Sequence, residues 1–205
     1  MAANIIFDLG NVLVDWDPVW DLQNLGLSPD GAKQVHQTLF ASQIWLDRDA
    51  GLLSFEETMA LTLPQLPAEL HAMTRHFALH WPEHLRINEP VVQLARALLK
   101  AGHPLYLLSN ASEPVLEVAV RLPVLNEFAG LMYSFEEKLL KPDRRIFLRL
   151  FERYQLKPEE SFFIDDSAAN IAAAGKLGMP GHHFTGDLPA LKAHMRAFGV
   201  QWEEA

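Results

Sequence analysis

Four short apolar runs in this chain each stop at residues that can carry charge or form hydrogen bonds. The runs and their final polar residues are 5–7 with Asp8, 104–108 with Ser109 and Asn110, 131–133 with Ser134, and 161–164 with Asp165 and Asp166. A continuous apolar run ended by turn residues is typical of a strand that is buried on both faces. The pattern therefore predicts buried strands that each deliver polar side chains at their ends.

Helical stretches lie between these runs. Apolar residues recur at helical spacing from Val91 to Leu99, and Gly102 follows as a stop signal. Further helices are predicted over 142–154, with Pro142 at the first position, over 168–177 and over 188–198. Strands that alternate with helices predict an α/β fold, a parallel sheet covered on both faces with its site at the carboxyl ends of the strands.

The segment 16–86 breaks this alternation, because its pattern predicts helices with no strand between them. Ser28-Pro29 is typical of one helix start, and Ser54 and Glu57 have the spacing of a capping box that starts another. A third helix is expected over 70–81. The segment lies between the first strand and the helix at 89–101, so we interpret it as an inserted helical cap.

Charge and cysteine content exclude several classes of function. The chain has 17 Lys and Arg against 26 Asp and Glu, a net charge of −9. Nucleic acids and anionic membranes usually bind basic faces, so we expect neither as a partner and favour small molecules or proteins. The absence of cysteine excludes a disulfide scaffold, a thiolate-zinc site and a cysteine nucleophile.

The N-terminal sequence favours a cytoplasmic protein. It reads Met-Ala-Ala-Asn-Ile-Ile-Phe-Asp, with an acid at position 8 and none of the basic residues that begin a secretory signal. No apolar run approaches the roughly 20 residues that a membrane helix requires. The sequence gives no indication of the oligomeric state.

Four polar clusters stand at strand ends or helix starts and should meet at one sheet edge. They are Asp8 with Gly10, Ser109 with Asn110, Lys141 with Pro142, and Asp165 and Asp166 with Asn170. The set offers a carboxylate nucleophile, a hydroxyl and an amide, a cation, and a carboxylate pair. These are the groups that phosphoryl transfer to an aspartate requires, with a divalent cation held by the carboxylates.

The four clusters together resemble the motifs of the haloacid dehalogenase superfamily. Its first motif, Asp-x-Asp-x-Val/Thr after a strand, is similar to the segment from Asp8 to Val12, and its second, a strand ending in Ser or Thr, is similar to Leu107-Leu108-Ser109-Asn110. Its third, a Lys before a helix, is similar to Lys141-Pro142, and its fourth, an acidic pair after a strand, is similar to Asp165-Asp166 followed by Asn170. All four occur in order, across nearly the whole chain.

The resemblance implies a Rossmann-like core, 1–15 and 87–205, with a helical cap at 16–86. By analogy, Asp8 attacks phosphorus and forms an aspartyl-phosphate that water hydrolyses. Mg²⁺ would be held by Asp8, the carbonyl of Gly10, Asp165 and Asp166, while Ser109, Lys141 and Asn110 would hold the phosphate oxygens. The substrate would be a small phosphorylated metabolite, similar to a sugar phosphate.

Gly10 departs from the phosphatase pattern. Most phosphatases of the superfamily have an Asp two residues after the nucleophile, which protonates the leaving group and later activates water. Loss of such a group typically lowers the rate by about 10²- to 10⁴-fold. The Asp-Leu-Gly-Asn-Val form resembles a subgroup of small capped members that includes a sugar-1-phosphate phosphatase, so we expect a slower or differently assisted enzyme.

Gly10 also leaves two alternatives open. The first is a metal-independent 2-haloacid dehalogenase, since those relatives lack the second Asp as well. The second is a phosphate-binding or regulatory protein with little turnover. Two adjacent carboxylates, Asp165 and Asp166, would repel Asp8 strongly without a cation, which favours the magnesium enzyme.

The remaining polar and aromatic candidates are open to structural interpretations. Asn170 is as suited to holding a loop as to touching the substrate, and Asp15 is more typical of a loop hydrogen bond than of a replacement acid. His76, His80 and His84 recur every four residues beside an apolar stripe, which favours a half-exposed helix face over a metal site. Trp16, Trp20, Trp45 and Trp81 are mostly typical of packing within the cap or at its interface, with Trp16 or Trp45 as the candidate to line a substrate pocket under the cap.

Overall fold

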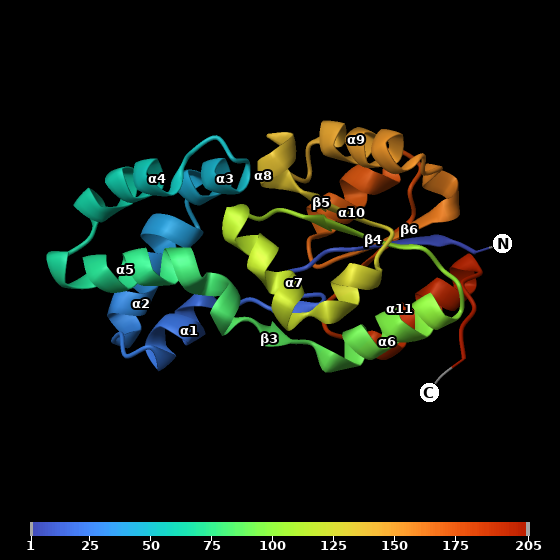
Figure 1. Cartoon of the computed structure of the whole chain (residues 1–205), viewed down its shortest axis with the longest axis horizontal. Helices are drawn as coiled ribbons and strands as arrows, with labels where there is room; N and C mark the ends of the chain where they lie inside the picture. Colours follow the sequence, from blue (N-terminus) through green and yellow to red (C-terminus); the bar gives the residue numbers. More distant parts are fainter. Residues whose placement is uncertain (1, 204–205) are drawn as a thin grey trace.

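A five-stranded parallel sheet forms the centre of the computed structural model, which describes residues 2–203 (Figure 1). Its order is β5-β4-β1-β6-β7. The strands are β1 (Asn4–Phe7), β4 (Leu105–Ser109), β5 (Gly130–Tyr133), β6 (Ser161–Asp165) and β7 (Gly181–His183). Strand β1 lies in the middle, with Ile5 in register with Leu105 on one side and Phe162 on the other. The strands predicted from the four apolar runs are confirmed.

Alternate side chains of β1 enter two separate apolar cores. Ile5 and Phe7 belong to a core with residues of α6 (Glu89–Lys100) and α11 (Leu188–Phe198). Ile6 points the other way, into a core with residues of α9 (Arg144–Tyr154) and α10 (Ala168–Gly175). Figure 1 shows these helix pairs on opposite faces of the sheet. The predicted α/β fold with helices on both faces is therefore confirmed.

Short helices complete the loops between the strands. They are α7 (Val118–Arg121), α8 (Ser134–Glu137) and the 3₁₀ helices Glu113–Glu117, Pro123–Glu127 and Pro158–Glu160. The prediction of Pro142 at the first helical position is wrong. Helix α9 begins at Arg144, because the Asp143 carboxylate accepts a hydrogen bond from the Arg145 amide and caps the helix there. No helix within residues 2–203 is long and apolar enough to cross a membrane.

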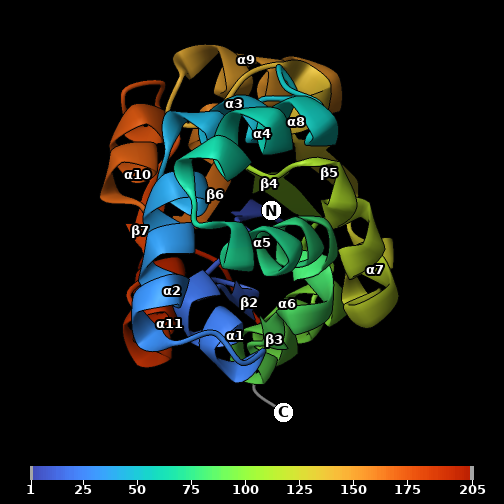
Figure 2. The same cartoon turned by 90° about the vertical axis from the view of Figure 1, so that its left-hand side faces the viewer.

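The segment between β1 and α6 is mostly helical and gathers at one end of the molecule (Figures 1 and 2). Its elements are α1 (Pro18–Asn24), α2 (Pro29–Val35), the π-helical turn His36–Phe40, α3 (Gln43–Asp49), α4 (Phe55–Thr62), the 3₁₀ helices Leu63–Gln65 and Trp81–His84, and α5 (Ala68–His80). Ser28 caps α2, and Ser54 forms the predicted capping box with Glu57 at the start of α4. The division of the chain into a core and a cap at 16–86 stays a prediction.

A small antiparallel sheet joins the two ends of this helical segment. It pairs β2 (Val14–Asp15) with β3 (Arg86–Ile87), so that the chain leaves and re-enters the core at neighbouring points. The expectation of no strand in 16–86 is therefore wrong at Arg86. Two-residue strands carry too short a pattern to be detected from sequence.

Gly51 allows the end of α3 to approach α8 closely. Its φ is +64°, and a Cβ at this position would lie 2.3 Å from the carbonyl oxygen of Phe135. The Lys138 ammonium donates to the Gly51 carbonyl, and the buried Ser134 hydroxyl donates to the Asp49 carbonyl. These contacts fix the last residues of α3 against the carboxyl edge of the sheet.

Candidate active site

Three neighbouring strands end in polar side chains. Asp8 directly follows β1, Ser109 is the last residue of β4, and Asp165 is the last residue of β6. Strands β4 and β6 flank β1 in parallel, so their carboxyl ends meet at one edge of the sheet. The structure thus brings these sequence-predicted residues to one place.

Lys141 lies at the centre of this cluster. Its Nζ is 2.8 Å from Asp8 Oδ1 and donates to Asp165 Oδ2 at 2.7 Å and to the Leu108 carbonyl at 2.8 Å. The side chain is only 1% exposed. A buried ammonium is stable only with such partners, and its three hydrogens have three acceptors here. Lys141 is therefore a fixed positive charge between two carboxylates.

Burial and neighbouring charges shift the pKa values in this cluster. Burial raises the pKa of Asp8 to about 7; Asp165 adds to the rise, and Lys141 opposes it. Burial lowers the pKa of Lys141, but the two carboxylates outweigh it and raise that pKa above its usual value. Lys141 therefore stays protonated. A divalent cation next to Asp8 would favour the ionised carboxylate that a nucleophile requires.

Asn110 contacts the main chain of Lys141 through both ends of its amide. Its Nδ2 donates to the Lys141 carbonyl at 2.9 Å, and its Oδ1 accepts from the Lys141 amide at 2.8 Å. These two bonds join the loop after β4 to the loop that carries Lys141. The structure therefore assigns Asn110 a positioning contact, and its direct contact with phosphate stays a prediction.

Asp165 is fully buried and its second carboxylate oxygen is also occupied. Asp165 Oδ1 accepts from the Ser167 amide at 2.8 Å and from Asn170 Nδ2 at 2.9 Å. Asn170 thus holds a candidate metal ligand in place, which is the structural role that the sequence left open. Its carboxamide supports Asp165 from the first turn of α10.

Asp8, Asp165 and Asp166 could hold a metal ion. Each offers one carboxylate oxygen, and these three oxygens lie within 4.8 Å of one another. With Lys141 protonated and all three acids ionised, the cluster carries a net charge of −2. Hard oxygen ligands and an unbalanced charge of this size fit Mg²⁺. Gly10 lies just after Asp8, and its carbonyl as a further ligand stays a prediction.

Asn11 is a supporting residue that the sequence did not single out. Its Nδ2 donates to Asp166 Oδ2 at 2.9 Å, and its Oδ1 accepts from the Trp16 amide at 3.0 Å. Its φ is +54°, a conformation that Asn tolerates better than most residues. An Asn in the loop after a strand was therefore the one sequence signal that could have indicated its role in holding Asp166.

Asp15 lies outside the candidate site. It stands in β2, where its carboxylate is 57% exposed and 4.0 Å from Arg86 Nε. It neither joins the carboxylate cluster nor lines the pocket described next. The structure therefore favours its pairing with Arg86 over the role of a replacement acid.

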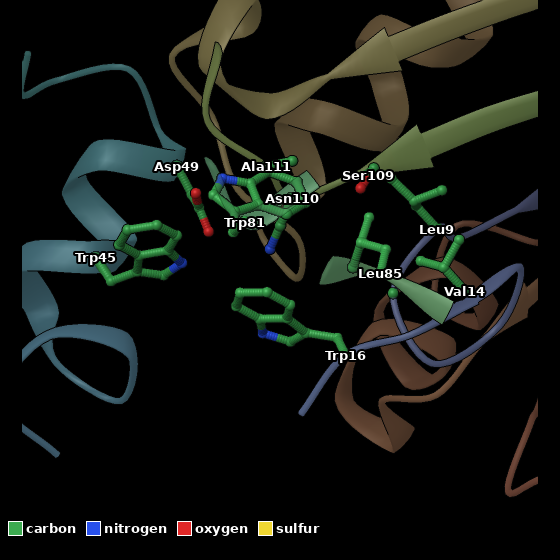
Figure 3. Close-up of a pocket in the computed structure, with 11 residues that line it drawn as sticks. Leu9, Val14, Trp16, Trp45, Asp49, Trp81, Leu85, Ser109, Asn110 and Ala111 are labelled. Atoms are coloured by element: carbon green, nitrogen blue, oxygen red, sulfur yellow. The ribbon is translucent and has the colours of Figure 1, made fainter. Parts of the chain in front are cut away.

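A pocket lies between the sheet edge and the helical segment (Figure 3). Residues of both regions line it: Leu9, Gly10, Val14, Trp16, Trp45, Asp49, Trp81, Leu85, Ser109, Asn110 and Ala111. Trp16 and Trp45, the candidates from the sequence, both line this pocket, and so does Trp81, for which the sequence indicated packing. Trp16 stacks parallel to Phe77 and meets Trp81 edge to face. The helical segment therefore supplies an aromatic wall, and the sheet edge supplies polar groups.

Asp49 is the pocket residue that sequence reasoning missed. It ends α3, is 8% exposed, and its Oδ1 has no hydrogen-bond partner within residues 2–203. Burial raises its pKa to about 7, although Ser112 and Arg48 partly oppose the rise. A carboxylate at a helix C-terminus is electrostatically disfavoured. The sequence signal that could have indicated a functional role for Asp49 was an acid at the end of a helix, two residues before Gly51.

Gly10 leaves room where a side chain could stand. The nearest atom to a Cβ built there is the Trp16 Cβ at 4.0 Å, an ordinary contact. Its φ lies outside the left-handed region that favours glycine. Neither the backbone nor the surrounding space therefore requires glycine at this position.

Comparisons with known proteins agree with this geometry. The family model described as a hydrolase, haloacid dehalogenase-like hydrolase, matches residues 3–178. The sesquiterpene phosphatase astK of Aspergillus oryzae is 26% identical over 187 residues, 89% of this chain and 90% of the relative. The D-ribitol-5-phosphate phosphatase of Bacteroides thetaiotaomicron is 28% identical over 191 residues, 87% of this chain and 89% of the relative.

A solved structure shows the same fold. The family enzyme bt-2542 of Bacteroides thetaiotaomicron, crystallised with magnesium and inorganic phosphate, superposes with a TM-score of 0.69 at 23% identity. The match covers 91% of this chain and 96% of that chain. At this identity the likeness supports the fold, and the chemistry rests on the residues of the site.

Proposed function

This chain belongs to the haloacid dehalogenase-like hydrolases, and we propose that it is a Mg²⁺-dependent phosphatase that acts on a small phosphorylated metabolite similar to a sugar phosphate. In this proposal Asp8 is the nucleophile, and the protein acts in the cytoplasm. Two phosphatases among its relatives, which match nearly the full length of the chain, support the reaction class.

The observation that carries the proposal is the carboxylate cluster around Lys141. Three carboxylate oxygens of Asp8, Asp165 and Asp166 lie within 4.8 Å of one another. One ammonium balances only part of their charge, so a divalent cation completes the site electrostatically. A phosphate ester needs such a cation and an ammonium, because negative charge gathers on its oxygens during transfer.

Each residue then has a defined task. The Asp8 carboxylate attacks phosphorus, the bond to the leaving oxygen breaks, and an aspartyl-phosphate forms on Asp8. Ser109 and Lys141 hold the phosphate oxygens, while Asn110 and Asn170 keep Lys141 and Asp165 in place. Bound Mg²⁺ would supply positive charge that screens the phosphate from the carboxylates.

The pocket favours a substrate with an apolar face and hydroxyl groups. Trp16, Trp45 and Trp81 present flat indole surfaces, and the Trp81 Nε1 donor is buried without a partner in the described chain. Indoles pack on apolar faces while their N–H groups bond to polar atoms. A polyol or sugar carbon chain offers both features, as does the ribitol moiety in the name of one relative.

A second candidate is a 2-haloacid dehalogenase, which the glycine at position 10 favours. Such an enzyme attacks carbon with Asp8 and needs no metal. Asp165 and Asp166 argue against it, because their charge close to Asp8 would repel an anionic substrate in the absence of a cation.

A panel of phosphate esters, containing sugar, polyol and sesquiterpenyl phosphates, tests the proposal. We expect phosphate release that requires Mg²⁺, stops with EDTA and is absent in D8N. Halide release from 2-chloropropionate in the presence of EDTA would support the dehalogenase instead. Binding of Mg²⁺ and beryllofluoride without turnover of any ester would indicate a regulatory phosphate-binding protein.

A further inference from the structure

Phosphate esters of sugars and polyols leave as alkoxides, which need a proton. The resemblance to the family phosphatases places the proton donor at position 10, where this chain has glycine. Without a donor, transfer from an alkyl phosphate is slower by about 10²- to 10⁴-fold. If the chain is a phosphatase as proposed above, another group must supply this proton, and the present inference rests on that function.

The pocket contains a suitable group on its opposite wall. Among the pocket-lining residues in the described part of the chain, Asp49 alone has a side chain that ionises near neutral pH. Figure 3 shows its carboxyl turned into the pocket, between Trp45 and the amide of Asn110. Gly10 and Ser109 line the same pocket from the sheet edge. The carboxyl therefore faces the space that a leaving group would occupy.

Ser112 lies against the Asp49 carboxyl and opposes the rise of its pKa, so one carboxyl oxygen, Oδ1, is left for a proton transfer. Its main-chain carbonyl accepts from the buried Ser134 hydroxyl, so the backbone is held. Its side-chain Oδ1 is buried and unpartnered within residues 2–203. A buried oxygen without a partner is unfavourable unless a ligand completes it. The main chain of Asp49 is thus held in place, while Oδ1 is free to bond to a ligand.

We propose that Asp49 is the general acid and base of this enzyme, in place of the acid missing at position 10. In the first step the Asp8 oxygen bonds to phosphorus, the phosphorus–oxygen bond to the alcohol breaks, and the Asp49 carboxyl gives its proton to the leaving oxygen. In the second step the Asp49 carboxylate takes a proton from water, whose oxygen bonds to phosphorus. The bond to Asp8 then breaks, and phosphate leaves.

The protonation state of Asp49 is consistent with this role. Burial raises its pKa to about 7, so a large fraction carries the proton at neutral pH. Three charged side chains lie around Asp49. Arg48 is on the same helix and interacts electrostatically with Glu113, which follows β4. Lys138, at the end of α8, donates to the Gly51 carbonyl. The Arg48 guanidinium lowers the pKa of Asp49 only in part.

The leaving group provides the test. In D49N, kcat for the best alkyl phosphate of the panel should fall by about 10²- to 10⁴-fold. 4-Nitrophenyl phosphate has a leaving group that needs no proton, so D49N should release one equivalent of nitrophenol per enzyme in a fast burst. The following steady state should be slow, because water is no longer activated.

The matched control is D47N. Asp47 is a half-buried acid on the same helix that does not line the pocket, so D47N should behave as wild type with both substrates.

A rescue variant separates proton transfer from structural support. Because the backbone at Gly10 has room for a side chain, G10D in the D49N background should restore at least 10-fold of the lost alkyl phosphatase activity, an order-of-magnitude expectation from the usual contribution of such acids. The pH dependence of the wild-type enzyme gives a further test. For the alkyl phosphate, kcat/KM should fall as the pH rises above about 7, because Asp49 loses its proton. For 4-nitrophenyl phosphate, kcat/KM should show no such fall.

Three outcomes would overturn the inference while leaving the phosphatase in place. They are unchanged alkyl phosphatase activity in D49N, an equal loss of the nitrophenol burst and the alkyl activity in a D49N variant that is at least as stable as wild type, and the same alkaline decline of kcat/KM for both substrates in the wild type. Absence of any phosphate release by the wild type, with Mg²⁺ present, would instead overturn the proposed function.

Discussion

The two walls of the pocket satisfy their polar atoms in opposite ways. At the sheet edge, the Lys141 ammonium has three acceptors, and both oxygens of Asp165 are hydrogen-bonded. On the side of the helical segment, Asp49 Oδ1 and Trp81 Nε1 are buried without partners in the described chain. The sheet edge is thus assembled before a substrate arrives, whereas the opposite wall leaves contacts for the substrate to complete.

This difference matches the two tasks of the proposed enzyme. Phosphate is common to all substrates of a phosphatase, so a fixed arrangement of charges serves it best. The rest of the substrate varies, and unpartnered donors and acceptors select molecules that can pair with them. Changes at the sheet edge should therefore affect stability and chemistry together, while changes on the opposite wall should separate them.

Substitution of Lys141 should have the largest effect on stability. K141M leaves Asp8 and Asp165 buried without their cation, and loss of one partner of a buried ion pair typically lowers the free energy of unfolding by about 3–5 kcal/mol. Mg²⁺ should restore part of this loss, because it replaces the missing charge. Urea unfolding with and without Mg²⁺ measures both effects.

The exposed Lys100 at the end of α6 offers a matched control for this substitution. K100M should leave the free energy of unfolding within about 0.5 kcal/mol of wild type. Equal stability of K141M and K100M would show that the central ammonium does not hold the sheet edge together.

Substitution of Asp49 should raise the stability of the protein while it lowers the activity, unlike substitution of Lys141, which should lower both. In the folded state its pKa is about 7, against 3.8 for an ordinary Asp, so the folded protein keeps a proton that the unfolded chain loses. This carboxyl therefore lowers stability as the pH rises from about 4 to 7, by at most about 4 kcal/mol. D49N removes the effect and should be more stable than wild type at pH 8, with a smaller difference at pH 5.

Urea unfolding of D49N, D47N and wild type at the two pH values tests this prediction. The control D47N changes a half-buried acid on the same helix and should stay within about 0.5 kcal/mol of wild type at both pH values. A D49N variant less stable than wild type at pH 8 would indicate that Asp49 is a structural anion, and the contrast between the two walls would disappear.

Asn170 should have a smaller effect, which is confined to the metal. N170A removes one of the two donors to Asp165 Oδ1 and keeps the Ser167 amide. Loss of a residue that orients a ligand typically weakens metal binding by about 10- to 100-fold. Calorimetric titration with Mg²⁺ measures this, with N126A, an exposed position, as the control. Unchanged affinity would mean that Ser167 and Lys141 suffice to hold Asp165.

The sheet edge was predictable from sequence because its signals are local. Asp8, Ser109 and Asp165 each follow an apolar run, and the topology of parallel sheets brings such strand ends together. Lys141 was predicted through the order of the motifs. Its exact partners, including the Leu108 carbonyl, follow from tertiary packing that no local pattern contains.

The opposite wall was not predictable to the same extent, because its key residue depends on a long-range contact. Asp49 lies where Gly51 lets α3 approach α8 and where the Ser134 hydroxyl donates to its main-chain carbonyl. Asp15, for which the sequence favoured a structural role over that of a replacement acid, lies in β2 with its carboxylate 4.0 Å from Arg86 of β3.

The central claim is that phosphate passes through the Asp8 carboxylate, and the most direct measurement is chemical trapping of that intermediate. Enzyme quenched with acid during turnover of a phosphate ester is treated with borohydride, which reduces an acyl phosphate to the alcohol and converts Asp to homoserine. Peptide mass spectrometry should find homoserine at position 8 with Mg²⁺ present, more of it in D49N, and none with EDTA. Turnover with homoserine at another position, or at none, would contradict the account.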